Sequence, residues 1–346
     1  MKRIISLLVV ISMLSLVLAG CSSSGVDKTD GKSSEHSVIM VADVGGVNDQ
    51  SYNQSAWEGL QALEEETGIK VSFIETVQMS DLATNFDKAA DGEHDLIWGI
   101  GFNTADPLAA SAKMNPEQAY AIVDHEYGDD ILPNVTCAIF DMEEASFIVG
   151  YIAGLTTETN KVAYIGGMRS PVMDLFEYGY RAGVHYAAKE LGKDIQVEVQ
   201  IAESFTDAAK GKAIAASLYS AGCDIIFHAA GATGNGVIEQ AAEDDKWVIG
   251  VDRDQLYLAP NNVLTSALKH VGAVTHDLSK RMILDGEDLG GQVIRYGLAN
   301  GGVGIPENNP NMDPKVYEKA LEIQELIIKG ELVPPYNEET FKDFIK

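Results

Sequence analysis

Residues 43–53 read DVGGVNDQSYN, and the rest of the chain is organised around this stretch. The apolar run Val38–Val41 precedes it, and Ser55–Glu66, whose apolar residues have helical spacing, follows it. The pattern predicts a strand, a turn carrying glycines, acids, an amide and an aromatic ring, and then the start of a helix. Loops at the carboxyl ends of strands form the ligand crevice of open α/β sheets. We therefore expect this stretch to form half of a binding cleft whose other half lies in a second lobe.

The N-terminus has the pattern of a signal peptide. Lys2 and Arg3 are followed by the apolar run Ile4–Ala19, which is shorter than the roughly 20 residues that span a bilayer. Residues 18–21, LAGC, look like a lipobox, at which cleavage would leave Cys21 as a lipid-modified N-terminus. We predict a signal peptide over 1–20 and a flexible tether, rich in Ser, Gly, Asp and Lys, over 21–37. The protein would then be anchored to the extracytoplasmic face of the cell membrane.

The charge of the chain limits its partners. The formal net charge is −27, and loss of the signal peptide would make it more negative by two charges. Nucleic-acid binding depends on Lys and Arg that neutralise phosphates, and binding to anionic lipid needs a polybasic patch. We expect neither, and we expect the lipid alone to hold the protein at the membrane. The two remaining cysteines, Cys137 and Cys223, fall in predicted strands, so we expect free, buried thiols.

The 346 residues suffice for two domains, and short apolar runs alternate with helical segments along the chain. This alternation predicts parallel strands with right-handed crossovers, arranged as two doubly wound α/β lobes. We assign 38–140 and about 267–296 to the first lobe, and 141–266 and about 297–346 to the second. The chain would cross between lobes near Asp141, near Ser266 and near 297–304. A last helix, Pro314–Ile328, would precede a polar tail.

Motifs for catalysis are absent from the sequence. It contains no G-x-S-x-G, no G-x-x-x-x-G-K-[ST], no H-E-x-x-H and no C-x-x-C. The seven histidines are scattered, and the spacing of His270 and His276 matches no usual metal site. Gly231–Gly236 follows a predicted strand, but its order G-x-x-G-x-G is not that of a dinucleotide loop. We therefore predict a binding protein with no catalytic residue, no cofactor and no metal.

The carboxyl ends of the predicted strands carry aromatic rings, carboxylates, an amide and helix starts. They comprise Asp43 with Tyr52 and Asn53, residues 101–104, Asp124, residues 166–168, Phe227 with residues 231–234, and residues 252–255. Rings can stack on a flat ligand, carboxylates accept from hydroxyl and N–H groups, and apolar walls enclose the rest. The mixture suits a neutral, flat, polyhydroxylated ligand.

Four segments resemble the basic membrane protein family, the nucleoside-binding lipoproteins related to the purine nucleoside receptor. Residues 43–59 look like its signature D-x-G-x-x-D-D-x-S-F-N-Q-x-x-W-E-G, and residues 227–237, 248–255 and 264–269 resemble further segments in the same order. The resemblance covers essentially the whole mature chain. It implies a type I periplasmic-binding-protein fold, a nucleoside ligand (a purine nucleoside first), an ABC permease as partner, and a monomer.

The resemblance also implies roles for particular residues. The base would lie between Tyr52 and Phe227, with Asn53 and Asp124 bonded to its edges. Asp43 would support the loop or touch the ligand, and Gly231 would let the backbone approach it closely. Asp252 and Lys269 would hold the ribose hydroxyls.

This chain departs from the family signature within the loop itself. Tyr52 stands where the family usually has Phe, and Asn48 and Gln50 replace an acid and a lysine. These substitutions leave the choice of base open.

Several site residues also have structural interpretations. Ser51 or Asn53 could cap the helix that begins near Ser55, and either Asp252 or Asp254 could be a turn former. Phe227 could be a core residue. Phe102, Phe176 and Phe205 are rival second aromatics, and we expect Phe176 to lie in the core.

Three other functions remain open on the residues alone. A sugar or autoinducer receptor on the same fold would use similar aromatic platforms and carboxylates. A surface nucleoside-processing enzyme would need clustered aspartates for a metal, and none is seen near Asp43. A structural adhesin would not need aromatics and acids at strand ends.

Overall fold

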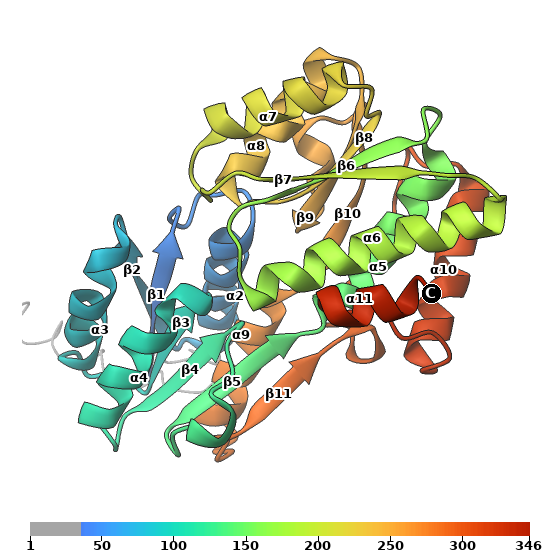
Figure 1. Cartoon of the computed structure of the whole chain (residues 1–346). Coiled ribbons are helices and arrows are strands. Elements are labelled where there is room, and N and C mark those ends of the chain that lie inside the picture. Colours follow the sequence, from blue (N-terminus) through green and yellow to red (C-terminus); the bar gives the residue numbers. More distant parts are fainter. Residues whose placement is uncertain (1–35) are drawn as a thin grey trace, which may run out of the picture. The chain divides into compact units, whose positions relative to one another are not determined.

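Two six-stranded sheets form the framework of this computed structural model, which describes residues 36–346 (Figure 1). The predicted signal peptide, Cys21 and the predicted tether up to residue 35 lie outside the described residues. The first sheet has the order β11-β5-β4-β3-β1-β2, with every pair parallel. Its strands are β1 (Ser37–Val44), β2 (Lys70–Thr76), β3 (Leu96–Ile100), β4 (Ala119–Val123), β5 (Val135–Phe140) and β11 (Val293–Tyr296).

The second sheet repeats this order as β12-β10-β9-β8-β6-β7. All of its pairs are parallel except that of β10 with β12. Its strands are β6 (Lys161–Gly166), β7 (Gln196–Ile201), β8 (Ile225–Ala229), β9 (Trp247–Asp252), β10 (Val263–Lys269) and β12 (Val303–Gly304). Strands β3 and β8 are buried at every residue, as expected of parallel strands covered on both faces. The prediction of two doubly wound α/β lobes is confirmed.

Helices cover both faces of each sheet. In the first lobe α3 (Leu82–Ala90) and α4 (Ala105–Met114) pack on one face, and α2 (Tyr52–Thr67) and α9 (Val271–Ile283) on the other. In the second lobe α7 (Ala208–Ser220) and α8 (Ala232–Glu243) face α5 (Met142–Thr156) and α6 (Pro171–Leu191) across the sheet. Within residues 36–346, five short 3₁₀ turns complete the connections: Met79–Asp81, Phe102–Thr104, Gly128–Asp130, Leu256–Leu258 and Leu298–Asn300.

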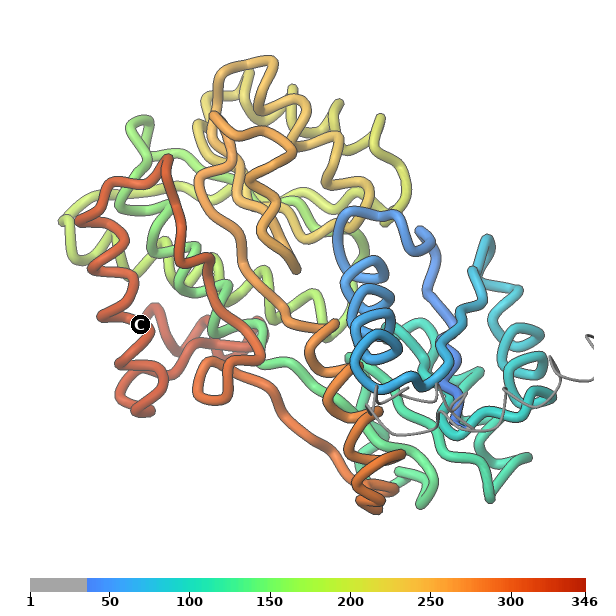
Figure 2. The backbone as a smooth tube through the Cα atoms, turned by 180° about the vertical axis from the view of Figure 1, so that it is seen from behind, coloured from blue at the N-terminus to red at the C-terminus, as the bar shows by residue number. Residues whose placement is uncertain are grey.

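The chain passes between the two sheets three times, which can be followed along the backbone in Figure 2. It crosses after Phe140, after Lys269 and after Tyr296. The second crossing comes three residues later than we expected at Ser266. The reason is that β10 stays paired in the second sheet to its last residue, with Leu268 opposite Asp252 and Lys269 opposite Val303.

Two segments differ from the sequence expectations. Helix α8 begins at Ala232, so most of the glycine-rich segment 231–236 is helical rather than a loop. The predicted polar tail contains helix α11 (Glu338–Phe344), which follows α10 (Pro314–Ile328). The side chain of Asn337 caps α11, and the buried Phe341 anchors it, with the Arg181 guanidinium 4.5 Å from the centre of its ring.

One other expectation concerns burial. Cys137 and Cys223 are both buried and free, as predicted. Among the helices of residues 36–346, none has the length and apolar character needed to cross a membrane.

Candidate functional site

A cavity lies where the carboxyl ends of the two sheets face each other. Its volume is about 80 Å³. Both lobes line it, through Asp43, Val44, Gly45, Asp49, Tyr52, Asn53, Gly101, Phe102, Asp124, Val172, Met173, Phe176, Phe205, Ala229, Ala230, Gly231, Val251, Asp252 and Lys269. Seven of our eight predicted ligand residues are among these, and Phe227 is the exception.

Asp124 and Asp252 occupy equivalent places in the two lobes. Asp124 follows β4 and Asp252 ends β9, and these strands hold the same position in the two sheet orders. Both residues are in the left-handed region, with φ of 66° and 65°. Left-handed backbone is uncommon for residues other than glycine, and such strain gathers at ligand sites. Each lobe therefore directs one buried carboxylate into the cavity from the end of its fourth strand.

Lys269 places a cation between these acids. The residue is 1% exposed, and its ammonium forms an ion pair with the buried Asp124 carboxylate. The same Nζ lies 4.9 Å from the centre of the Tyr52 ring and 5.7 Å from that of Phe176. The ion pair and the rings hold this ammonium at the cavity wall, where it can donate to an acceptor on a ligand.

Asp43 sits deep in the first lobe at the end of β1. One of its oxygens accepts from the backbone N–H of Val44 at 2.7 Å, and the other from Asn103 Nδ2 at 2.8 Å. Burial raises the pKa of Asp43 to about 6, although these bonds oppose the shift. Gly101 has φ of 103°, and a methyl group there would lie 2.9 Å from the Asp43 carboxylate. A glycine is therefore required beside this acid.

The loop of residues 43–53 is held by Asp49. Its carboxylate accepts from the backbone N–H groups of Ser51, Asn53 and Gln54 at 2.9–3.1 Å. Asp49 therefore satisfies the free N–H groups at the start of α2, a role we had considered for Ser51 or Asn53. The amide of Asn53 joins two parts of the loop: its Nδ2 donates to Asp49 at 3.2 Å, and its Oδ1 accepts from the Asp43 N–H at 3.1 Å.

Four aromatic rings reach the cavity, two from each lobe. Tyr52 and Phe102 come from the first lobe, and Phe176 and Phe205 from the second. Phe102 and Phe205 meet edge to face, with ring centres 6.4 Å apart, and so bridge the lobes. The Tyr52 hydroxyl is buried and has no hydrogen-bond partner among the described residues. Burial, followed by the nearby Asp124 charge, raises the pKa of Tyr52 well above its ordinary value, so this hydroxyl stays protonated.

Phe227 lies in the core of the second lobe and not at the cavity wall, where we predicted it. Its side chain is fully buried in β8, with ring centres 5.2 Å from Tyr180 and 5.7 Å from Tyr164. The strand directs it toward α5 and α6 rather than toward the cavity. Phe176, which we expected in the core, lines the cavity and is also buried.

Other lining residues were missed from the sequence, and a signal for them existed. Val172 and Met173 lie in the first turn of α6, and in a parallel sheet helix starts lie at the same edge as strand ends. Conversely, the substituted loop residues Asn48 and Gln50 do not line the cavity, and Asn48 is exposed.

Asp252 is expected to make stability depend on pH. Burial raises its pKa to about 6, with Lys269 and the Ser51 hydroxyl only partly opposing the shift. Because its ordinary value is 3.8, the native state holds this proton more tightly than the unfolded chain, and stability falls as the pH rises toward 6. Asp252→Asn should therefore raise Tm by a few degrees at pH 7.5, and this gain should disappear at pH 4. Calorimetric melts at both pH values measure it.

Asp254→Asn is the matched control for that measurement, because its exposed carboxyl lies in the same loop. An equal Tm gain from Asp252→Asn at both pH values would contradict the assignment.

Comparison with known proteins places this site in a family. Residues 36–338 match the family described as "ABC transporter substrate-binding protein PnrA-like". The chain belongs to this family. The resemblance seen in the sequence is thereby confirmed, and the chain is an ABC transporter substrate-binding protein of this family.

Individual relatives agree. The chain is 39% identical to the "ABC transporter nucleoside-binding protein BmpA" of Lactococcus lactis subsp. cremoris, over 96% of this chain and 99% of that protein. It is 39% identical to "Basic membrane protein A" of Borreliella afzelii, over 89% and 94% of the two chains. Among solved structures, an ABC transporter solute-binding protein from Aeropyrum pernix K1 matches with a TM-score of 0.79 and 27% identity, covering 89% of this chain and 96% of that one.

Proposed function

We propose that this substrate-binding protein captures nucleosides, purine nucleosides first, as a lipid-anchored monomer at the extracytoplasmic face of the membrane and delivers them to an ABC permease. The observation that carries the proposal is one cavity lined by four aromatic rings, four buried carboxylates and one buried ammonium. A flat base can stack on rings, and its N–H edge can donate to Asp43 or Asp124. The ribose hydroxyls can meet Asp252 and Lys269.

The Lactococcus relative, whose name says that it binds nucleosides, supports the same ligand class. In the proposed cycle the ligand enters an open cleft and the lobes close on it by a hinge movement. No bond of the ligand is made or broken. Within residues 36–346 no group of three or more His, Cys, Asp or Glu side chains is arranged to hold a metal ion.

A titration tests the proposal directly. The purified protein is melted with adenosine, guanosine, inosine, cytidine, uridine or ribose, and binding is confirmed by calorimetry. A ligand at a hundredfold excess over its dissociation constant stabilises the native state by about 2.7 kcal/mol. We expect purine nucleosides to raise Tm most and ribose to leave it unchanged. A rise with ribose or another sugar, and with no nucleoside, would make the protein a sugar receptor on the same fold.

A further inference from the structure

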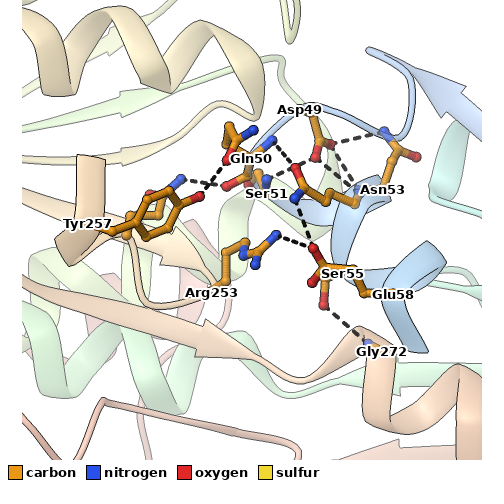
Figure 3. Close-up of polar contacts among 11 residues, drawn as sticks. Asp49, Gln50, Ser51, Asn53, Ser55, Glu58, Arg253, Tyr257 and Gly272 are labelled. Atoms are coloured by element: carbon orange, nitrogen blue, oxygen red, sulfur yellow. Dashed lines mark hydrogen bonds and ion pairs between the residues drawn. The ribbon is translucent and has the colours of Figure 1, made fainter. Parts of the chain in front are cut away.

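A ring of polar contacts joins the two lobes beside the cavity (Figure 3). The first lobe contributes the loop of residues 49–51 and the first turns of α2. The second lobe contributes the loop of residues 253–257, which follows β9. None of the side chains that join these two loops in the ring, those of Gln50, Arg253, Gln255 and Tyr257, lines the cavity.

Gln255 is fixed in its own lobe and presents a donor to the other. Gln255 is fully buried, and its side-chain Oε1 accepts from the Val251 N–H at 2.9 Å. Its backbone N–H donates to Ser266 Oγ at 3.2 Å. The remaining group, Nε2, donates to the backbone carbonyl of Gln50 at 3.1 Å. The only described partner of this buried amide nitrogen thus lies across the lobe boundary.

The Gln50 side chain makes a second contact across the boundary. Its Oε1 accepts from the Tyr257 hydroxyl at 2.6 Å. The backbone N–H of Gln50 donates to Gln54 Oε1 at 3.1 Å. Gln54 in turn donates to Glu58 at 2.9 Å, and Glu58 lies 3.2 Å from Arg253 Nη1. Together with the backbone of residues 253–257, these contacts form a closed circuit that leaves the first lobe at Gln50 and returns to it at Glu58.

Neighbours of these residues line the cavity. Gln50 lies between Asp49 and Tyr52 in sequence, and Gln255 is three residues after Asp252; all three of these neighbours line the cavity. Gln50 is in the left-handed region with φ of 60°, as Asp252 is with 65°. Such backbone persists only where surrounding contacts hold it. The circuit supplies those contacts on both sides of the boundary.

We propose that Gln50, Gln255 and Tyr257 form an inter-lobe latch that holds the closed state and sets the rate at which ligand leaves. Their contacts exist only while the lobes are together, so each one stabilises the closed state alone. Weakening the latch raises the open fraction, from which ligand escapes, and so lowers affinity without removing any ligand contact. These are positioning residues.

Stopped-flow release of inosine is the first test, and it rests on the proposed nucleoside function. Tyr257→Phe removes one exposed hydroxyl, and Gln50→Asn keeps an amide that tolerates the left-handed backbone but is one methylene too short. Each should speed release about two- to tenfold, the range of one hydrogen bond. Gln255→Glu keeps the shape and the Val251 contact but sets a carboxylate against the Gln50 carbonyl, so release should speed up at least tenfold.

Two comparisons separate the latch from general damage to the fold. The double variant Gln50→Asn/Tyr257→Phe should release inosine no faster than the more affected single variant, because both changes break the same bond. Tyr336→Phe, at a tyrosine as exposed as Tyr257 but outside the circuit, should change nothing. Additive effects of the two single changes would overturn the shared contact.

A distance measurement tests the latch without any ligand. Spin labels at Lys88→Cys in α3 and Lys210→Cys in α7 report lobe separation, and Cys137 and Cys223 are buried and will not react. Gln255→Glu should shift the distribution toward longer distances. An unchanged distribution and unchanged release would overturn the latch. If inosine does not bind, that result counts against the nucleoside proposal. The distance measurement needs no ligand and still decides for or against the latch.

Discussion

Lys269→Met is expected to destabilise the protein by about 3–5 kcal/mol and to abolish high-affinity binding. Lys269 is 1% exposed and Asp124 is 7% exposed, so the ion pair between them is almost free of solvent. Methionine fills the space but leaves the Asp124 carboxylate buried without its counter-charge. Denaturant unfolding measures the loss of stability, and calorimetry with the nucleoside measures the loss of binding.

The double variant Lys269→Met/Asp124→Asn separates the two effects. Replacing both partners of a buried ion pair by neutral groups is often close to neutral for stability, so most of the lost free energy should return. Binding should stay weak, because Lys269 and Asp124 are both proposed to contact the ligand and the double variant has lost both charges. Lys113→Met, at an exposed lysine of α4, is the matched control. A Lys269→Met protein as stable as the wild type would show that this ion pair contributes nothing net to the native state.

The architecture could be predicted because its cause is local. Each buried parallel strand is a short apolar run, and each covering helix has apolar residues at helical spacing, so the alternation and the strand ends could be located along the chain. Helix α11 was missed because Phe341 is its one buried residue, so its sequence has no apolar stripe at helical spacing. Its cap, Asn337 with Thr340 three residues on, was the available signal.

For the site residues, too, prediction depended on whether the position of a residue has a local cause in the sequence. Asp43, Asp124 and Asp252 follow apolar runs, and topology brings such positions together in any sheet of this kind. The position of Phe227 could not be predicted because β8 is buried on both faces. A strand of that kind has no polar alternation to show which face a side chain occupies. Phe205 could be named only as a rival, since its place depends on contacts distant in sequence. A methyl group on Gly167 would lie 2.2 Å from its ring.

Tyr52→Ala is expected to weaken nucleoside binding by about 5- to 150-fold, the value of one base–aromatic stack at roughly 1–3 kcal/mol. Phe205→Ala, at the ring contributed by the other lobe, should do the same. Tyr52→Phe keeps the ring face and removes only the hydroxyl, so it should cost no more than one hydrogen bond, about 0.5–1.5 kcal/mol. Calorimetric titration of the three variants measures these differences.

Phe227→Leu is the control that distinguishes a wall from a core residue. Its ring packs on Tyr164 and Tyr180 rather than on the cavity, so the leucine variant should bind nucleoside with unchanged affinity. Truncation to alanine should instead lower the free energy of unfolding by about 3–5 kcal/mol, because it opens a hole in the packed interior. If Phe227→Leu lost as much affinity as Tyr52→Ala while keeping its stability, the ligand would stack on Phe227, and β8 would have to present its other face in the bound state.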